Sequence, residues 1–151
     1  MLIEIRESPH HGRGVFALQP IPAGTVVLEF HGPRLKAHEV IPDSYHLQIG
    51  EFEYLGASRE ADDYVNHSCD PNCGVGKGLT LFALRDISAG EELTWDYSTA
   101  IDEDDFPGFP CQCGARCCRG MVRSFRDLPD DERRRLWPVL MPYLRDKYAT
   151  A

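Results

Sequence analysis

The sequence is organised around one short stretch, Tyr64-Val65-Asn66-His67-Ser68-Cys69-Asp70-Pro71-Asn72-Cys73. It combines an amide, an imidazole, a hydroxyl and two thiols with a proline turn, which is more chemistry than a connecting loop needs. Two later stretches contain groups that could act with it. Residues 91–97 read as a strand that ends in a tyrosine, and residues 111–118 contain four of the six cysteines. We expect these three stretches to meet at one site.

Length and composition predict a single globular domain. The chain has 151 residues, of which 42% are hydrophobic and 26% are charged, enough for one core and typical of globular proteins. Residues 1–6 alternate like a strand rather than a signal peptide, and no apolar run is long enough to cross a membrane. We therefore expect a protein without a membrane segment that works in the cytoplasm or the nucleus.

The formal net charge of the chain is −8. Duplex binding needs basic residues to neutralise phosphates, so this charge argues against direct nucleic-acid binding and favours a basic protein or peptide as the partner. Acidic residues are concentrated at 60–63, 102–105 and 130–132. Each cluster alone is typical of a solvated surface, but together they could attract a cationic peptide.

The cysteines favour a metal site over a disulfide framework. The sequence contains no secretory signal, and four thiols crowd into one short segment, whereas stabilising disulfides usually close longer loops. Cys111, Cys113 and Cys118 would give a tetrahedral zinc three of its four ligands. Cys69 is the preferred fourth ligand because it lies in the histidine-bearing stretch, and Cys117 is the alternative. A disulfide from Cys111 to a neighbouring cysteine is the less favoured interpretation.

Alternating apolar and polar residues, broken by glycine and proline turns, predict a mostly β domain of short strands. The run from 45 to 55 reads as a hairpin because Gly50-Glu51 interrupts two alternating halves. The remaining predicted strands cover residues 2–6, 15–18, 25–30, 79–84 and 93–97.

The character of the sequence changes after Tyr97. Residues 98–110 are acidic and contain proline, which is typical of a mobile surface loop. From Pro129 onward acidic residues precede basic ones, as the helix dipole favours. Pro138 and Pro142 interrupt this region, so we expect two short helices rather than one long helix.

Several candidate site residues also have ordinary structural explanations. Asn66 and His67 could satisfy the backbone of a turn, although their side chains equally suit ligand binding. The glycines on either side of Arg13 allow either a tight turn or a close approach of the backbone to a ligand. Tyr97 could be a core aromatic residue. Trp95 lies on the same face of its strand, so the pair could form an aromatic wall.

Five segments occur in an order and spacing that resemble a known family, namely Gly12–Phe16, Ile21–Gly24, Asn66–Cys73, Gly90–Tyr97 and Cys111–Gly120. Together they resemble the SET-domain protein lysine methyltransferases that carry a post-SET zinc motif. The resemblance runs from about residue 3 to about residue 123 and leaves the tail uncovered. It implies a SET β-fold in which the Asn-His-Ser-Cys segment and the tyrosine strand pass each other in a knot-like crossing.

The resemblance also implies a domain organisation. The SET domain would occupy residues 1–100, the acidic loop and post-SET zinc-binding segment residues 101–123, and a tail of short helices residues 124–151. This organisation describes a minimal, single-domain enzyme without a separate reader module.

The resemblance implies a role for each matching residue. Tyr97 would be the catalytic tyrosine, and Phe30 and Trp95 would line the substrate channel. S-adenosylmethionine would be bound by His11, Arg13, Tyr45, Asn66, His67, Tyr97 and Gln112. Zinc would be bound by Cys69, Cys111, Cys113 and Cys118.

The sequence departs from the family pattern at three sites. Asp62-Asp63 occurs where similar enzymes commonly carry Ala-Arg, so a contact through that arginine is missing. Phe30 stands where many relatives have tyrosine, which removes one hydroxyl from the channel. Trp95 replaces a phenylalanine or tyrosine at a position whose size and polarity affect the number of methyl groups added.

The implied function is S-adenosylmethionine-dependent methylation of a lysine in a basic protein such as a histone. A lysine amine with a pKa near ~10.4 must lose its proton before it attacks the methyl group. A nearby sulfonium cation and a dry aromatic channel both disfavour the charged amine. The alternative is a catalytically silent, zinc-stabilised SET-fold module that only binds, and normal cofactor binding without methyl transfer would distinguish it from the enzyme.

Overall fold

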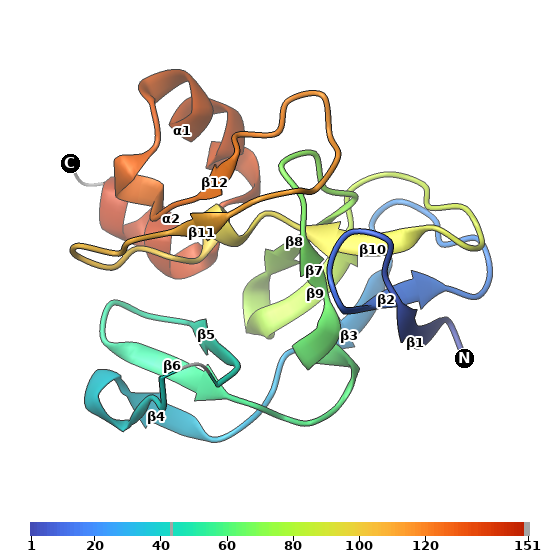
Figure 1. The fold of residues 1–151 in the computed structure, drawn as a ribbon, viewed down its shortest axis with the longest axis horizontal. Coiled ribbons are helices and arrows are strands. Elements are labelled where there is room, and N and C mark those ends of the chain that lie inside the picture. Colours follow the sequence, from blue (N-terminus) through green and yellow to red (C-terminus); the bar gives the residue numbers. More distant parts are fainter. Residues whose placement is uncertain (43, 150–151) are drawn as a thin grey trace.

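The computed structural model describes residues 1–42 and 44–149. Its strands are short and form several small sheets, and the helical tail packs at the end of the molecule far from the N-terminus (Figure 1). The predicted mostly β fold with two short C-terminal helices is confirmed. Residues 150–151 of the expected tail lie outside the described residues.

The central sheet has the strand order β1-β2-β10-β7. β1 (Ile3–Glu7) pairs antiparallel with β2 (Arg13–Ala17), and β2 pairs antiparallel with β10 (Glu92–Trp95). β10 also pairs in parallel with the short strand β7 (Asn66–His67). Because a parallel pair cannot be closed by a tight turn, the chain between β7 and β10 has to form a long connection.

Two further sheets and a short ribbon complete the described β structure. One sheet has the order β3-β9-β8, formed by Val26–Glu29, Thr80–Ala83 and Cys73–Gly76. The other has the order β4-β6-β5, formed by Arg34–Lys36, Glu53–Gly56 and His46–Gln48. The antiparallel pairing of β5 with β6 confirms the predicted hairpin. The ribbon flanks the cysteine segment and consists of β11 (Phe109–Pro110) and β12 (Met121–Val122).

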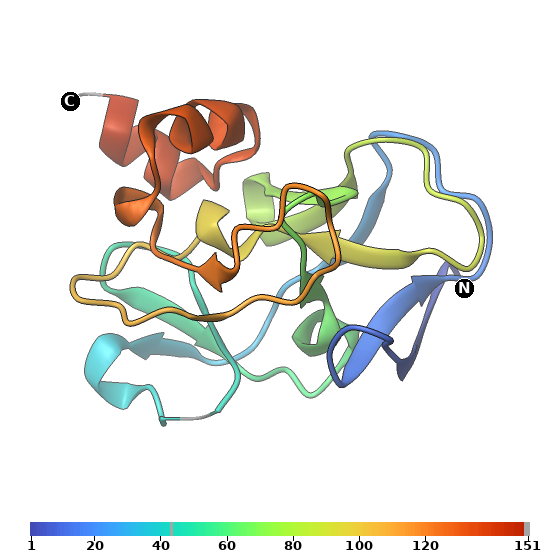
Figure 2. The same ribbon diagram turned by 45° about the horizontal axis from the view of Figure 1, so that its top comes forward.

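The C-terminal tail shares the core of the β domain. It contains α1 (Asp130–Leu136) and α2 (Pro142–Ala149), separated by a 3-10 turn over Trp137–Val139. Its own apolar cluster consists of Phe125, Leu128, Leu136, Leu140 and Leu144. Met141 instead belongs to the main core, together with strand residues such as Val15 and Leu93. Figure 2 shows the two helices together above the strands.

The expectation of a mobile surface loop over residues 98–110 is wrong for its first part. Tyr97–Thr99 form a 3-10 turn, and Ala100 and Asp102 are buried. The tail covers this segment, because the Met141 N–H donates to the Thr99 carbonyl at 3.0 Å. Local composition could not predict this burial, since the residues that cause it lie in another part of the sequence.

Two of the acidic clusters also contain a buried carboxylate, contrary to the expectation of fully solvated surface. Asp62 is 3% exposed and accepts hydrogen bonds from the Ser58 hydroxyl and the His31 N–H. Asp102 is 2% exposed and accepts hydrogen bonds from Arg126 and Tyr148. Both carboxylates therefore stabilise the fold instead of attracting a partner.

Candidate active site and cysteine cluster

The side chain of Asn66 connects three segments of the site. β7 and β10 lie side by side, with Thr94 opposite Asn66. The Asn66 Nδ2 atom lies 3.0 Å from the His11 carbonyl, 3.0 Å from the Arg13 carbonyl and 2.9 Å from Glu92 Oε2. It thereby ties the loop before β2 to β10.

Glu92 explains why a glycine follows Arg13. A Cβ atom on Gly14 would lie 2.3 Å from Glu92 Oε2, so a larger residue would have to displace the Glu92 carboxylate from Asn66. The other carboxylate oxygen of Glu92 accepts a hydrogen bond from the Ser8 hydroxyl at 2.8 Å. The Gly-Arg-Gly sequence therefore has a packing role at its second glycine.

The buried imidazole of His67 is held in one tautomer. Its Nδ1 atom accepts the backbone N–H of Tyr97 at 3.0 Å, so the neutral ring carries its proton on Nε2, 3.4 Å from Cys69 Sγ. Burial lowers the pKa of His67 to about 4, so the ring is neutral at physiological pH. His67 thus links the tyrosine to the cysteine cluster.

Tyr97 follows β10 instead of ending it, which corrects the predicted strand boundary. Its hydroxyl donates to the Val65 carbonyl at 2.6 Å. Burial raises the pKa of Tyr97 well above its usual range, so the phenol keeps its proton. Burial also raises the pKa of Tyr45, and the nearby Tyr97 raises it further.

The rings of Phe30, Trp95 and Tyr97 pack in a row, with Trp95 in the middle. The Trp95 ring centroid lies 4.8 Å from that of Tyr97 and 5.7 Å from that of Phe30. Phe30 and Trp95 are 2% and 3% exposed. Trp95 Nε1 is buried without a hydrogen-bond partner among the described residues. The expected aromatic wall therefore exists, with one free N–H donor in it.

A cavity of about 350 Å³ opens beside β7 and β10, within the size range of small-molecule sites. Asn66, His67 and Cys113 are among its lining residues. Of the other residues expected to bind the cofactor, His11, Arg13 and Gln112 are exposed and outside the cavity lining.

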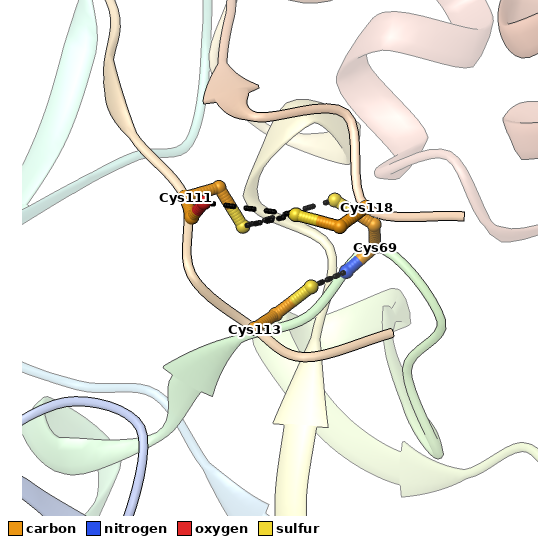
Figure 3. A group of neighbouring side chains, drawn as sticks. All are labelled: Cys69, Cys111, Cys113 and Cys118. Carbon is orange, nitrogen blue, oxygen red and sulfur yellow. Dashed lines mark hydrogen bonds between the residues drawn. The ribbon is translucent and has the colours of Figure 1, made fainter. Parts of the chain in front are cut away.

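The structure brings together four thiols, those of Cys69, Cys111, Cys113 and Cys118 (Figure 3). Their sulfur atoms all lie within 4.8 Å of one another. Cys111 Sγ is 3.8 Å from Cys69 Sγ and 3.7 Å from Cys118 Sγ. A tetrahedral zinc with bonds of about 2.3 Å would separate its sulfur ligands by about 3.8 Å, so the donors fit this metal.

Cys117, the alternative fourth ligand, lies outside this group. It is exposed, and its sulfur lies 3.5 Å from the Cys69 carbonyl oxygen instead of facing the other thiols. All six cysteines are free thiols, so the geometry favours the metal interpretation over a disulfide.

The thiols of the cluster differ in acidity. Burial raises the pKa of Cys111 to about 11. Burial would also raise the pKa of Cys113, but backbone hydrogen bonds from Cys69 and Ala115, with help from neighbouring thiols, lower it to about 7. Because metal binding requires thiolates, a zinc ion would displace protons from most of these sulfurs.

The sequence interpretation did not include Arg119 and Asp96, which join the cysteine cluster to the tyrosine. Arg119 Nη2 donates to both carboxylate oxygens of Asp96, at 2.8 and 2.9 Å. The backbone N–H of Arg119 lies 3.4 Å from Cys69 Sγ. The only sequence signal was the arginine directly after Cys118.

A family model described as SET domain matches residues 12–98, more than half of the chain. The chain belongs to the SET-domain family. The tail after residue 98, with the cysteine segment and both helices, lies outside the match.

Curated relatives of this SET domain carry lysine methyltransferase names. A protein of Eremothecium gossypii named histone-lysine N-methyltransferase, H3 lysine-4 specific, is 32% identical over 140 residues, which cover 80% of this chain and 14% of that protein. Human histone-lysine N-methyltransferase 2B is 35% identical over 138 residues, which cover 78% of this chain and 5% of that protein. The chain thus spans a small part of these relatives.

Solved structures resemble this SET domain over most of its length. The crystal structure of KRYPTONITE with mCHG DNA and SAH has a TM-score of 0.67 and 29% identity, and the match covers 80% of this chain and 29% of that chain. The methyltransferase domain of human SETMAR has a TM-score of 0.67 and 24% identity, and the match covers 81% and 58% of the two chains. The second likeness shows the fold alone.

Proposed function

We propose that this SET domain is an S-adenosylmethionine-dependent protein-lysine N-methyltransferase that acts on a basic protein, with a histone tail as the first candidate. The observation that carries the proposal is the parallel pairing of β7 with β10, because it sets His67 and Tyr97 side by side next to the Phe30–Trp95 pair. The names of the relatives support it, as does a KRYPTONITE structure that contains an H3(1-15) peptide and SAH.

The cavity beside β7 suits a small-molecule cofactor. Its volume of about 350 Å³ and its polar lining, including Asn66 and Ser68, fit a ligand that carries both apolar and hydrogen-bonding groups. His11 and Arg13 would contact the cofactor from the loop that Asn66 holds in place, and Tyr45 and Gln112 remain proposed contacts. S-adenosylmethionine supplies the methyl group when it is bound.

The residues around Tyr97 favour a neutral substrate amine. A lysine in contact with the Phe30, Trp95 and Tyr97 rings would lose most of its hydration, which disfavours the ammonium form. Its proton would pass to solvent before transfer. The amine nitrogen would then bond to the methyl carbon while the carbon–sulfur bond breaks and the sulfur keeps the electron pair.

Tyr97 would orient the amine and would not deprotonate it. Burial keeps the pKa of the phenol high, so Tyr97 is a poor source of a phenolate base. Its proton is already donated to the Val65 carbonyl, so the hydroxyl oxygen is available to accept an N–H from the amine. Accurate positioning of the reacting atoms then supplies most of the rate acceleration.

Zinc would have a structural role. Cys69 follows β7, while Cys111, Cys113 and Cys118 lie in the segment between β11 and β12. A zinc ion bound by these four thiolates would clamp that segment onto the site. A histone substrate would place the protein in the nucleus.

The test is transfer of labelled methyl from S-adenosylmethionine to core histones by zinc-loaded protein. We expect Tyr97→Phe to lower the rate by about 10²-fold, since it removes one polar group at the reacting centre. Tyr54→Phe is the matched control, because it also removes a phenolic hydrogen bond, to Glu103, while the ring of Tyr54 packs against His46 and not against Phe30, Trp95 or Tyr97. It should retain activity near that of the native protein.

Other outcomes separate the remaining possibilities. If the native protein binds the cofactor and labels another basic protein but no histone, the substrate proposal is wrong and the reaction stands. If it binds the cofactor and labels no lysine-containing substrate, the silent binding module is the better description. If zinc-loaded protein does not bind S-adenosylmethionine, the proposed function is wrong.

A further inference from the structure

Arg119 lies between the cysteine cluster and the segment that carries Tyr97. Its side chain is 10% exposed and that of its partner Asp96 is fully buried. Isolated charges of this kind are costly to bury, so each requires the other. Arg119 comes directly after Cys118, and its backbone N–H approaches Cys69 Sγ at 3.4 Å.

A zinc-loaded cysteine cluster would need a nearby positive charge. Four thiolates and one Zn²⁺ have a total charge of −2, and the buried carboxylate of Asp96 adds another negative charge nearby. Arg135 also reaches Cys69, but through the carbonyl oxygen at 3.2 Å, and its guanidinium is paired with Glu132 at 2.8 Å. Arg119 pairs directly with Asp96, and its backbone N–H adjoins Cys69 Sγ, so its positive charge lies beside both the buried carboxylate and the cluster.

The guanidinium of Arg119 has unused hydrogen-bonding capacity. Among the described residues, its Nη2 atom alone makes hydrogen bonds, to Asp96 and, at 3.4 Å, to the Ser98 hydroxyl. Nε and Nη1 are buried without a hydrogen-bond partner among the described residues, although Nη1 lies 3.9 Å from a carboxylate oxygen of Glu132. Buried donors in native proteins are nearly always satisfied. These two donors therefore leave part of the positive charge of the guanidinium unmatched by the described residues.

We propose that Arg119 is the counter-ion of the zinc–thiolate centre and, through Asp96, a positioning residue for Tyr97. This inference rests on the proposed zinc site. Asp96 accepts the Ser98 N–H at 3.0 Å and lies 3.7 Å from His67 Nδ1, the atom that accepts the Tyr97 N–H. The ion pair thus connects the cysteine segment to the turn that holds the tyrosine.

The first test measures zinc affinity of the full chain by competition with a chromogenic chelator. We expect Arg119→Gln to weaken zinc binding by about 10–100-fold, the usual effect of losing a partner just outside the metal ligands. Arg119→Lys should give a smaller loss because it keeps the charge. Arg116→Gln is the control, since Arg116 is an exposed arginine of the same segment with no ion pair to the described residues.

A double variant separates the metal role from simple pairing with Asp96. In Arg119→Gln/Asp96→Asn the buried carboxylate is neutral, so thermal stability should recover relative to Arg119→Gln while zinc affinity stays low. If zinc affinity recovers as well, Arg119 acts only as the partner of Asp96 and the inference is wrong. It is also wrong if Arg119→Gln binds zinc as tightly as Arg116→Gln.

Failure of the zinc site and failure of the methyltransferase proposal give different results. If the native chain binds no zinc, both the zinc site and the role of Arg119 are wrong. The methyltransferase proposal is then judged by the methyl-transfer assay alone. If Arg119 positions Tyr97, zinc-saturated Arg119→Gln should lose kcat more than it raises KM, and Arg119→Lys should restore part of kcat. Equal kcat in zinc-saturated native and variant proteins would exclude the positioning role.

Discussion

At the scale of single residues, Asn66 holds separate parts of the candidate site together through one amide nitrogen. Its acceptors are the His11 carbonyl in the loop before β2, the Arg13 carbonyl at the start of β2 and the Glu92 carboxylate on β10. His11 and Arg13 are proposed to contact the cofactor. Asn66 would therefore act on cofactor binding through the position of this loop.

We predict that Asn66→Ala destabilises the protein by about 1–3 kcal/mol, because buried acceptors lose their donor. The affinity for S-adenosylmethionine should fall as the loop loosens. Chemical denaturation and calorimetric titration measure the two effects. Gln19→Ala, which removes one exposed hydrogen bond to the Met1 carbonyl, should change neither. Native cofactor affinity in Asn66→Ala would contradict the proposed role of the loop.

From the sequence we expected Cys69, and not Cys117, to join the other three thiols, because it lies beside His67, and the structure brings its thiol into the cluster. It also predicted the contact between Trp95 and Tyr97 from strand periodicity. It could not predict the partner of Asp96, since that contact depends on how the cysteine segment folds back. Nor did it reveal that the Asn66 amide is used within the protein.

At the scale of elements, the buried carboxylate of Asp102 attaches the C-terminal tail to the β domain. It accepts hydrogen bonds from Arg126 Nε at 3.2 Å, from the Tyr148 hydroxyl at 2.8 Å and from Lys147 at 3.1 Å. Burial alone would raise the pKa of Asp102, but these donors outweigh it and hold the pKa below its usual range. These three donors therefore stabilise the ionised carboxylate of Asp102.

We predict that Asp102→Asn destabilises the protein by about 1.5–3 kcal/mol at neutral pH, because the buried carboxylate loses its charge-assisted hydrogen bonds from partly exposed Arg126 and Lys147. The folded pKa is depressed, so the stabilisation is present above the unfolded pKa and is lost as the pH falls through the folded pKa. The difference between native and variant proteins should therefore shrink in acid. Urea unfolding across the acid range measures it.

Asp105→Asn is a suitable control for that experiment. Asp105 is exposed and has a positive φ of 54°, a conformation that asparagine adopts readily. Its stability should match that of the native protein at every pH. A constant difference between Asp102→Asn and native protein down to the lowest pH would show that charge is not the cause.

The fold was predictable where local pattern decides it. Alternating residues in β1, β3, β9 and the β5–β6 hairpin pointed to strands that the structure contains. Prediction failed where residues distant in the sequence determine the local structure. The segment after Tyr97 is an example, because the C-terminal tail buries it. β7 has only two residues, too few for a periodic pattern, and it exists because β10 lies beside it.

At the scale of the whole molecule, the net charge of −8 is carried largely by exposed groups. Asp62, Asp96 and Asp102 are buried with partners, so their charges act locally. Exposed carboxylates such as Asp70, Asp105 and Asp131 remain to act at a distance. They would attract a basic peptide and would do so less effectively in salt.

We predict that the KM for a histone-tail peptide rises with ionic strength while kcat changes little, since screening acts on exposed charges beyond a Debye length of about 10 Å at 0.1 M salt. Initial rates at several salt concentrations measure both constants. A peptide with the same target lysine but neutral neighbours should have a KM that is nearly independent of salt. Salt-independent KM values for both peptides would rule out long-range attraction.

The four thiols also impose an order on the folding of the chain. Cys69 and Cys111 are 42 positions apart in sequence, and Cys69 follows a strand that is paired with distant β10. Contacts between such remote segments form late, because loop closure costs entropy before it is compensated. A newly made chain can complete the four-ligand site only after β7, β10 and the cysteine segment have assembled. Zinc uptake would then mark the completion of folding, and zinc shortage in the cell would lead to unfinished chains and thus to low protein abundance.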